Sequence, residues 1–243
     1  MSAPRFFTYC YLIFGIIINS YLKAQFNNFV KIDAQIRNFG FDAGVGIHKT
    51  NEIDNVGFAY GVKLGPINHP KEIPVINTGL PGSSSFKLDK INYVWAFRPF
   101  IQKSIYLSKR KSRFQVAYSF DYGGSLNAAY SWPVYIWLYQ GRAPFDGYAN
   151  VRYNPSIHEP NLIGGASSFS RGFKEGGIIW GLGCFAAATV EWGSYRSLKN
   201  SLSLGISNDI FLQKLPLLHN ESLNRFNFPA LFVNFAVGFG SDH

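Results

Sequence analysis

The chain has 243 residues, of which 47% are hydrophobic, 17% aromatic and only 15% charged. Because soluble domains carry about 25% charged residues, this composition argues against an ordinary water-soluble fold. The formal net charge of +9 would attract anionic partners. The basic residues are dispersed, however, with one dense cluster over 109–113, so we expect no nucleic acid among the partners.

The first 24 residues have the order of a cleaved secretory signal. Arg5 precedes an apolar run over 6–21, and Ala24 supplies a small residue for cleavage. We therefore predict a signal peptide over 1–24 and a mature domain over 25–243. The alternative, an N-terminal membrane anchor, is disfavoured because the run is short and a strand pattern follows it directly. Cleavage would remove Cys10 and leave Cys184 alone, which excludes a disulfide framework.

Beyond the leader, no stretch reaches the roughly 18 apolar residues that a membrane-spanning helix requires. Apolar residues instead alternate with polar or small ones, which is the pattern of a β-strand with two different faces. The fifth such segment is expected to continue through a bulge at Gly123 and Gly124 to Trp137. The alternation predicts strands over 30–37, 41–48, 56–64, 91–102, 114–122, 178–192, 198–210 and 230–239.

The composition of the two strand faces favours a barrel in a membrane. A soluble sandwich or a lipocalin-like barrel would alternate in the same way, but its polar face would be rich in Lys and Glu. Here that face is mostly Gly, Ala, Ser and Asn, which fit inside a narrow barrel. Only a closed barrel satisfies every strand's backbone in lipid, and bacterial barrels have even strand numbers. We predict an all-β fold, a single antiparallel transmembrane β-barrel of about eight strands in the outer membrane of a Gram-negative bacterium.

The lengths of the connections predict how the barrel is oriented. The long connections fall at 66–90, 139–175 and 214–227, and short ones alternate with them. Outer-membrane barrels have short periplasmic turns and long extracellular loops. Both termini are therefore expected in the periplasm, with the three long loops outside.

The inward face carries charges of both signs. An eight-stranded barrel is just wide enough for its own side chains, and charges in such a space should pair. We predict a structural charge network that fills the interior, with a proton or ion path as the alternative. Its members are expected to be Lys31, Asp33, Arg37, Asp42, Lys63, Arg98, Asp121, Glu191 and Asp209.

No spacing in the sequence indicates chemistry. His69 with Glu72 and His158 with Glu159 lie in predicted outer loops, away from metal-ligand spacing on any regular element. Serine is abundant, but no serine is singled out beside a base. We expect no catalytic residue, no cofactor-binding residue and no metal ligand.

Several short motifs resemble a family of small outer-membrane β-barrels of the Bacteroidota. They are Ile47–Thr50, Gly61–Gly65, Asn68–Glu72, Arg152–Pro155 with His158, and Ser168–Gly172. The resemblance implies the compartment and the fold, and it carries over no activity.

These observations predict a structural or interaction role, such as an accessory subunit of a secretion or assembly complex of the envelope. The expected partners are outer-membrane lipid, lipopolysaccharide and envelope proteins that bind the loop from Tyr139 to Glu175. Two alternatives stay open, a lipid-modifying enzyme of the outer leaflet and a small narrow channel.

Overall fold

The computed structural model describes residues 26–51, 55–80, 82–108, 116–142, 145–193 and 198–240. The predicted signal peptide over 1–24 and the basic cluster over 109–113 lie outside the described residues. In the described part of the chain, no helix has the length and hydropathy of a membrane span.

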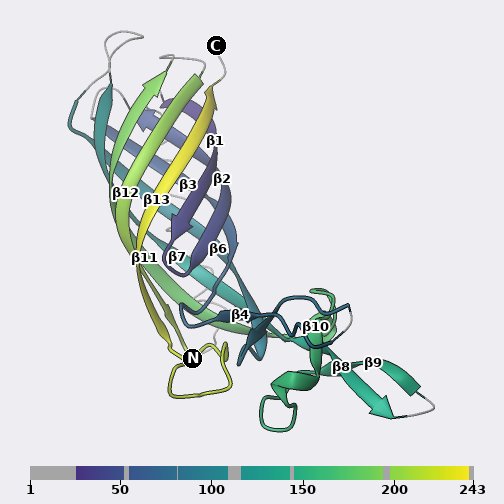
Figure 1. Ribbon diagram of the computed structural model, residues 1–243. Helices are drawn as coiled ribbons and strands as arrows, with labels where there is room; N and C mark the ends of the chain where they lie inside the picture. The colour runs from purple at the N-terminus through teal and green to yellow at the C-terminus, as the bar shows by residue number, and fades with distance from the viewer. Residues whose placement is uncertain are drawn as a thin grey trace, which may run out of the picture.

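Eight long strands close into one antiparallel barrel, in the order β1-β13-β12-β11-β7-β6-β3-β2 (Figure 1). Closure comes from the first and last strands, where Phe29 pairs with Gly240 and Arg37 pairs with Phe232. All eight predicted strands are present, and the predicted fold class is confirmed. Their bounds are β1 (Phe26–Arg37), β2 (Gly40–Asn51), β3 (Val56–Pro66), β6 (Asn92–Tyr106), β7 (Ala117–Pro133), β11 (Gly177–Gly193), β12 (Leu198–Phe211) and β13 (Asn227–Gly240).

The prediction for the fifth strand was wrong in two details. β7 keeps one register against β11 through Gly123 and Gly124, so no bulge interrupts it. The strand also ends at Pro133, before Trp137. Proline has no N–H to donate to a strand ladder, and the amide of the next residue, Val134, donates to the carbonyl of Ile91 instead. The chain thus leaves the barrel wall at this point.

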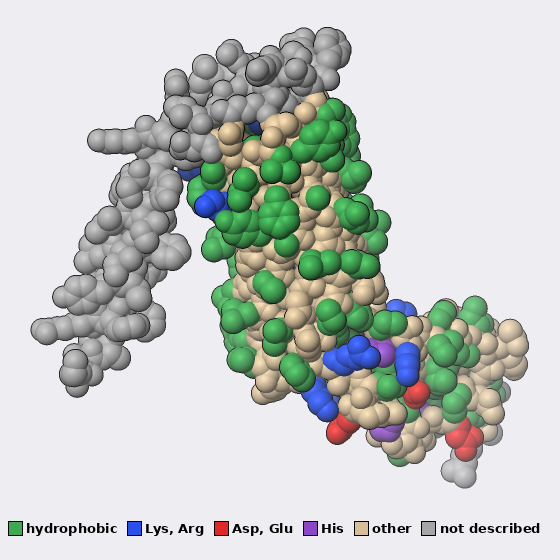
Figure 2. Space-filling model, turned by 90° about the vertical axis from the view of Figure 1, so that its left-hand side faces the viewer, with side chains coloured by type: hydrophobic (Ala, Val, Ile, Leu, Met, Phe, Trp, Pro, Cys, Tyr) green, Lys and Arg blue, Asp and Glu red, His purple; other side chains and the backbone are tan. Residues whose placement is uncertain are grey.

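The barrel is apolar outside and polar inside. Outward side chains such as Ile36 and Leu231 are 70% and 67% exposed, whereas the inward Asp42 and Asp209 are buried. On the face visible in Figure 2, hydrophobic side chains are spread over the wall, and acidic and histidine side chains gather at the loop end. This arrangement is the reverse of a water-soluble barrel, which buries its apolar side chains.

The connections are short at one end of the barrel and mostly long at the other. The segments 52–55, 107–116 and 194–197 join strands at the end where β13 finishes, and the two-residue turn 38–39 lies at the opposite end with 67–91, 134–176 and 212–226. This agrees with the predicted alternation of lengths.

Two of the long connections build a small folded unit, here called the loop domain (residues 67–91 and 134–176). It lies at the end of the barrel opposite the C-terminus (Figure 1). Its core is formed by Phe86, Val134, Ile136, Tyr153 and Ile163. Its elements are β4 (Ile73–Val75), β5 (Phe86–Leu88), β8 (Tyr135–Arg142), β9 (Phe145–Arg152), β10 (Ile163–Ala166) and the 3-10 helices η1 (Pro160–Leu162) and η2 (Phe173–Glu175).

The third long connection, the cap loop (residues 212–226), closes the barrel mouth with apolar side chains. Leu215, Leu217 and Leu218 are buried against Phe211 and Phe228 at the strand ends. The Asn224 side chain holds this loop in place. Its Oδ1 accepts hydrogen bonds from the amides of Leu217 and Leu218 at 3.1 and 2.9 Å, and its Nδ2 donates to the Leu218 carbonyl at 2.8 Å.

Candidate functional site in the barrel interior

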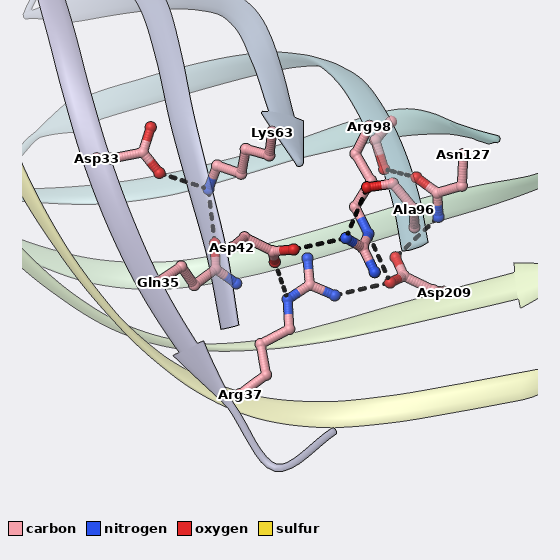
Figure 3. A network of polar contacts seen from close by, with 10 residues as sticks. Asp33, Gln35, Arg37, Asp42, Lys63, Ala96, Arg98, Asn127 and Asp209 are labelled. Atoms are coloured by element: carbon pink, nitrogen blue, oxygen red, sulfur yellow. Dashed lines mark hydrogen bonds and ion pairs between the residues drawn. The ribbon is translucent and has the colours of Figure 1, made fainter. Parts of the chain in front are cut away.

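The interior holds a ring of two arginines and two aspartates near the loop end of the barrel (Figure 3). Arg98 contributes Nη1 to Asp42 at 2.6 Å and Nε to Asp209 at 3.2 Å. Arg37 lies with Nε and Nη1 2.7 Å from the same two carboxylates. Each carboxylate therefore faces two guanidinium groups, and the four charges sum to zero. The planar fork of arginine suits such shared contacts.

The ring lies directly below the cap loop. Arg98 also donates to the carbonyl of Ala96, a residue in the apolar cluster beneath the cap. Asn127 of β7 donates from Nδ2 to Asp209 Oδ1 at 2.9 Å, so this carboxylate has partners on three strands. The ring ties β1, β2, β6 and β12 together across the barrel.

A second group surrounds Lys63 (Figure 3). Its Nζ donates to Gln35 Oε1 at 2.6 Å and lies 3.4 Å from Asp33 Oδ2. The same ammonium group lies 5.2 Å from the ring centroid of Phe100 and 6.0 Å from that of Phe185. Aromatic faces attract cations, so these rings supplement the single carboxylate.

A third group lies towards the end of the barrel with the short turns. Lys31 Nζ donates to Glu191 Oε1 at 2.9 Å, and the Tyr106 hydroxyl donates to Glu191 Oε2 at 3.4 Å. His48 Nε2 lies 3.5 Å from the Tyr106 hydroxyl. Lys199 Nζ stacks 3.9 Å above the ring centroid of Phe29.

Asp121 differs from the other predicted members. Among the described residues it forms no ion pair within 4.0 Å, and hydroxyl groups satisfy its carboxylate instead. Ser119 donates to Oδ1 at 3.0 Å, and Thr189 donates to Oδ2 at 2.6 Å. Hydrogen bonds to the charged form stabilise a carboxylate without a cation.

The structure therefore places all nine predicted residues in the interior and brings eight of them into ion pairs. Sequence reasoning left out Gln35, His48, Tyr106, Asn127 and Lys199. With Lys199 included, five basic and five acidic side chains of the described strands balance. Two cavities between them measure about 40 and 20 Å³. A water molecule needs roughly 10–15 Å³ of such space, so each has room for only one or a few waters.

No protein-family model and no curated protein matches the chain. Among solved structures, it is similar to Neisserial surface protein A, NspA, with 9% identity and a TM-score of 0.39 over 89% of this chain and 96% of that chain. It is also similar to the N-terminal β-barrel domain of Pseudomonas aeruginosa OprF, with 10% identity and a TM-score of 0.37 over 89% of this chain and all of that domain. At these values no function is carried over, and the fold rests on the strand pairing of this chain.

Outside the barrel, the motif at 68–72 builds a polar anchor for the loop domain. Glu72 accepts hydrogen bonds from Lys87 Nζ at 2.6 Å, Lys90 Nζ at 2.8 Å and the His69 amide at 2.8 Å. Lys90 also donates to Asn68 Oδ1 at 3.2 Å. Burial raises the pKa of Glu72, but the charge of Lys90 and the hydrogen bonds from both lysines outweigh it and lower that pKa. The motif therefore has a structural role.

Two loops also bring a serine and a histidine together. Ser156 Oγ of the loop domain lies 3.1 Å from His219 Nε2 of the cap loop, and both side chains are exposed. In the described part of the chain, no carboxylate is hydrogen-bonded to the other ring nitrogen of His219. The pair therefore lacks the third group that orients the base in a serine hydrolase.

Proposed function

We propose that the chain is an outer-membrane β-barrel protein whose barrel anchors the loop domain, and that the loop domain binds another protein of the envelope. The role is structural, as an accessory subunit of a secretion or assembly complex. The resemblance of several short motifs to small barrels of the Bacteroidota supports this compartment.

The outer wall supports the membrane location. Each barrel strand has at least 11 residues, and about 9–11 residues span the bilayer on a tilt. The outward side chains along them are apolar, which suits lipid and would cost free energy in water. In this proposal the loop domain is outside the cell, both termini are periplasmic, and the surrounding partners are outer-membrane lipid and lipopolysaccharide.

The single observation that carries the interaction role is an ordered domain with exposed apolar side chains on a filled barrel. The two interior cavities between the described residues measure only about 40 and 20 Å³, whereas Ile76 and Leu162 of the loop domain are 58% and 39% exposed. These two residues flank a contact in which Asn77 Nδ2 donates to the Asn161 carbonyl. Exposed apolar residues in water mark interaction sites when they gather.

Affinity purification from native membranes in mild detergent tests this role. The variant Ile76→Ser with Leu162→Ser should lose a co-purifying envelope protein that the wild-type chain retains. Leu212→Ser is the matched control, because Leu212 is 82% exposed but lies in the cap loop. Repeated recovery of the wild-type chain alone, or equal recovery of the partner by both variants, would contradict the proposal.

The contact between Ser156 and His219 supports a second candidate, a lipid-modifying enzyme of the outer leaflet. A serine beside a histidine base is the minimal arrangement for acyl transfer. Mass spectra of lipid A from cells with the wild-type chain and with Ser156→Ala test it. Different spectra would favour the enzyme, and identical spectra would eliminate it.

A further inference from the structure

A groove in the outer wall of the barrel crosses β11, β12 and β13. Two outward rows border it. Cys184, Asn208 and Pro229 are register partners in one row, and Ala186, Ile206 and Leu231 are register partners in the other. The groove has a volume of about 520 Å³, and Asn38 of the turn between β1 and β2 lies at its edge. Binding pockets for small ligands typically measure about 300–1,000 Å³.

The groove follows from a mismatch in strand length. The β1–β2 hairpin turns at residues 38–39, so the pairing of β1 with β13 ends at Phe232. β13 begins at Asn227, so five residues extend past the last β1 partner (Figure 1). The neighbouring outward side chains of β11, Cys184 and Ala186, are smaller than the outward Leu182 and Trp180 that precede them, and they leave space beside β12.

One polar atom at the groove has no partner. Asn208 Oδ1 is shielded from solvent and has no hydrogen bond in the described structure. Leaving such a group buried and unsatisfied costs free energy, and a polar side chain that faces lipid is rare and marks a functional site. Asn208 Oδ1 can only accept, so its missing partner is a donor.

We propose that this groove binds an acyl chain of lipopolysaccharide. This inference rests on the membrane location proposed above. The groove opens to the hydrocarbon of the bilayer, so an acyl chain is the occupant that the surrounding lipid would supply. Asn208 is three residues from the end of β12 at the loop end, which is the outer-leaflet side in this orientation. The amide-linked and hydroxylated acyl chains of lipopolysaccharide carry N–H and O–H donors for Asn208. Phospholipid acyl chains are joined by esters, which only accept.

Native mass spectrometry of the purified barrel, incubated separately with lipopolysaccharide and with phosphatidylethanolamine, tests the proposal. The wild-type barrel should retain lipopolysaccharide in preference to phosphatidylethanolamine. Ala186→Phe fills the groove and should abolish retention. Ala188→Phe is the matched control, because Ala188 is the next outward residue of β11 and does not line the groove. Asn208→Leu should lower the preference about fivefold, the effect of one hydrogen bond.

Heat-modifiable gel migration is measured on every variant to separate two kinds of failure. A chain that purifies as a soluble protein without heat-modifiable migration contradicts the membrane barrel itself. A folded membrane barrel whose Ala186→Phe variant retains lipopolysaccharide like the wild type overturns the groove alone. Equal retention of both lipids by the wild type, or a polypeptide displaced by Ala186→Phe, also overturns it.

Discussion

Asp42 and Asp209 each face two arginines. Because the carboxylates share these partners, the ring of two arginines and two aspartates is sensitive to the loss of any one member. A buried charge is tolerated only when its partners neutralise it and fill its hydrogen-bonding positions. Removing one arginine would leave two carboxylates facing one guanidinium. The ring is therefore more vulnerable to a single substitution than an isolated surface pair would be.

The variant Arg98→Met should destabilise the barrel by about 3–5 kcal/mol, the usual cost of breaking a buried ion pair from one side. Urea unfolding of the barrel in lipid vesicles measures the change. Lys103→Met is the control on the same strand, because Lys103 points outward near Phe58. Equal effects of the two substitutions would show that the ring does not stabilise the fold.

The lowered pKa of Glu72 makes the anchoring of the loop domain depend on pH. The stabilisation is complete above the ordinary carboxyl pKa of 4.5 and is lost as the pH falls through the lowered value. The protection of residues 67–91 against hydrogen exchange, corrected for the intrinsic pH dependence of amide exchange, should therefore fall on acidification more steeply in the wild type than in Glu72→Gln. Burial also lowers the pKa of His69, but His69 is present in the wild type and in Glu72→Gln, so it does not account for a difference between them. Glu159→Gln, at an exposed site, should behave like the wild type, and parallel curves for all three would contradict this assignment.

At the scale of elements, the cap loop depends on one side chain. Asn224 forms three hydrogen bonds that hold a turn over Leu217 and Leu218. Hydrogen bonds from a side-chain amide to the backbone can take the place of the backbone hydrogen bonds of a helix or sheet. One polar side chain therefore holds the apolar cap loop over the barrel mouth.

Asn224→Ala should release the cap loop while the barrel stays closed. Three hydrogen bonds of about 0.5–1.5 kcal/mol each are lost, and the two backbone amides lose a buried acceptor. Limited proteolysis should cut within residues 212–226 of the variant and leave the strands intact. Asn220→Ala, which removes only exposed contacts with Ser222, is the control. Resistance of the Asn224 variant equal to that of the control would refute the role of this side chain.

The barrel strands could be predicted because lipid and lumen impose opposite demands on neighbouring residues. Ile36 and Arg37 show this alternation, and both face the predicted side. The loop domain could not be predicted in the same way. β10 is four residues long and reads Ile-Gly-Gly-Ala, which has no period. The end of β7 was hidden because an unbroken run of apolar and aromatic residues continues past Pro133 into β8.

The interior site was predictable as a set of residues but not as a set of contacts. Alternation tells which face Arg98 occupies, but its level in the barrel depends on the stagger between strands. Only that stagger brings Arg98 to both Asp42 and Asp209. Lys199 has the inward parity and could have been included. The predicted strand ended at Gln102, four residues before Tyr106, so the alternation gave no indication that Tyr106 faces the interior.

At the scale of the whole molecule, the described part of the lumen is occupied by the barrel's own side chains, with cavities of about 40 and 20 Å³ between them. The cap loop closes the mouth with leucines, and the charged groups below it are paired or held by hydroxyls. A path for ions would have to break these contacts. These contacts are consistent with the proposed role of the barrel as a support for the loop domain.

Planar-bilayer recording of the purified protein should show no conductance steps. A variant without residues 213–225 should also show no conductance steps, because the charged groups below the cap loop still fill the interior. Steps in the wild type would contradict the filled lumen. Steps in the shortened variant alone would show that the cap loop, and not the charge network, blocks the path.

The pairing of β1 with β13 also has a consequence for how the protein is made. Phe29 meets Gly240 across almost the whole chain, and folding slows as contacting residues become more distant in sequence. The seam can close only after the last strand has been synthesised. Until then, strand edges and apolar side chains are exposed and prone to aggregate. Loss of the final strand should therefore leave an aggregation-prone chain rather than a smaller barrel.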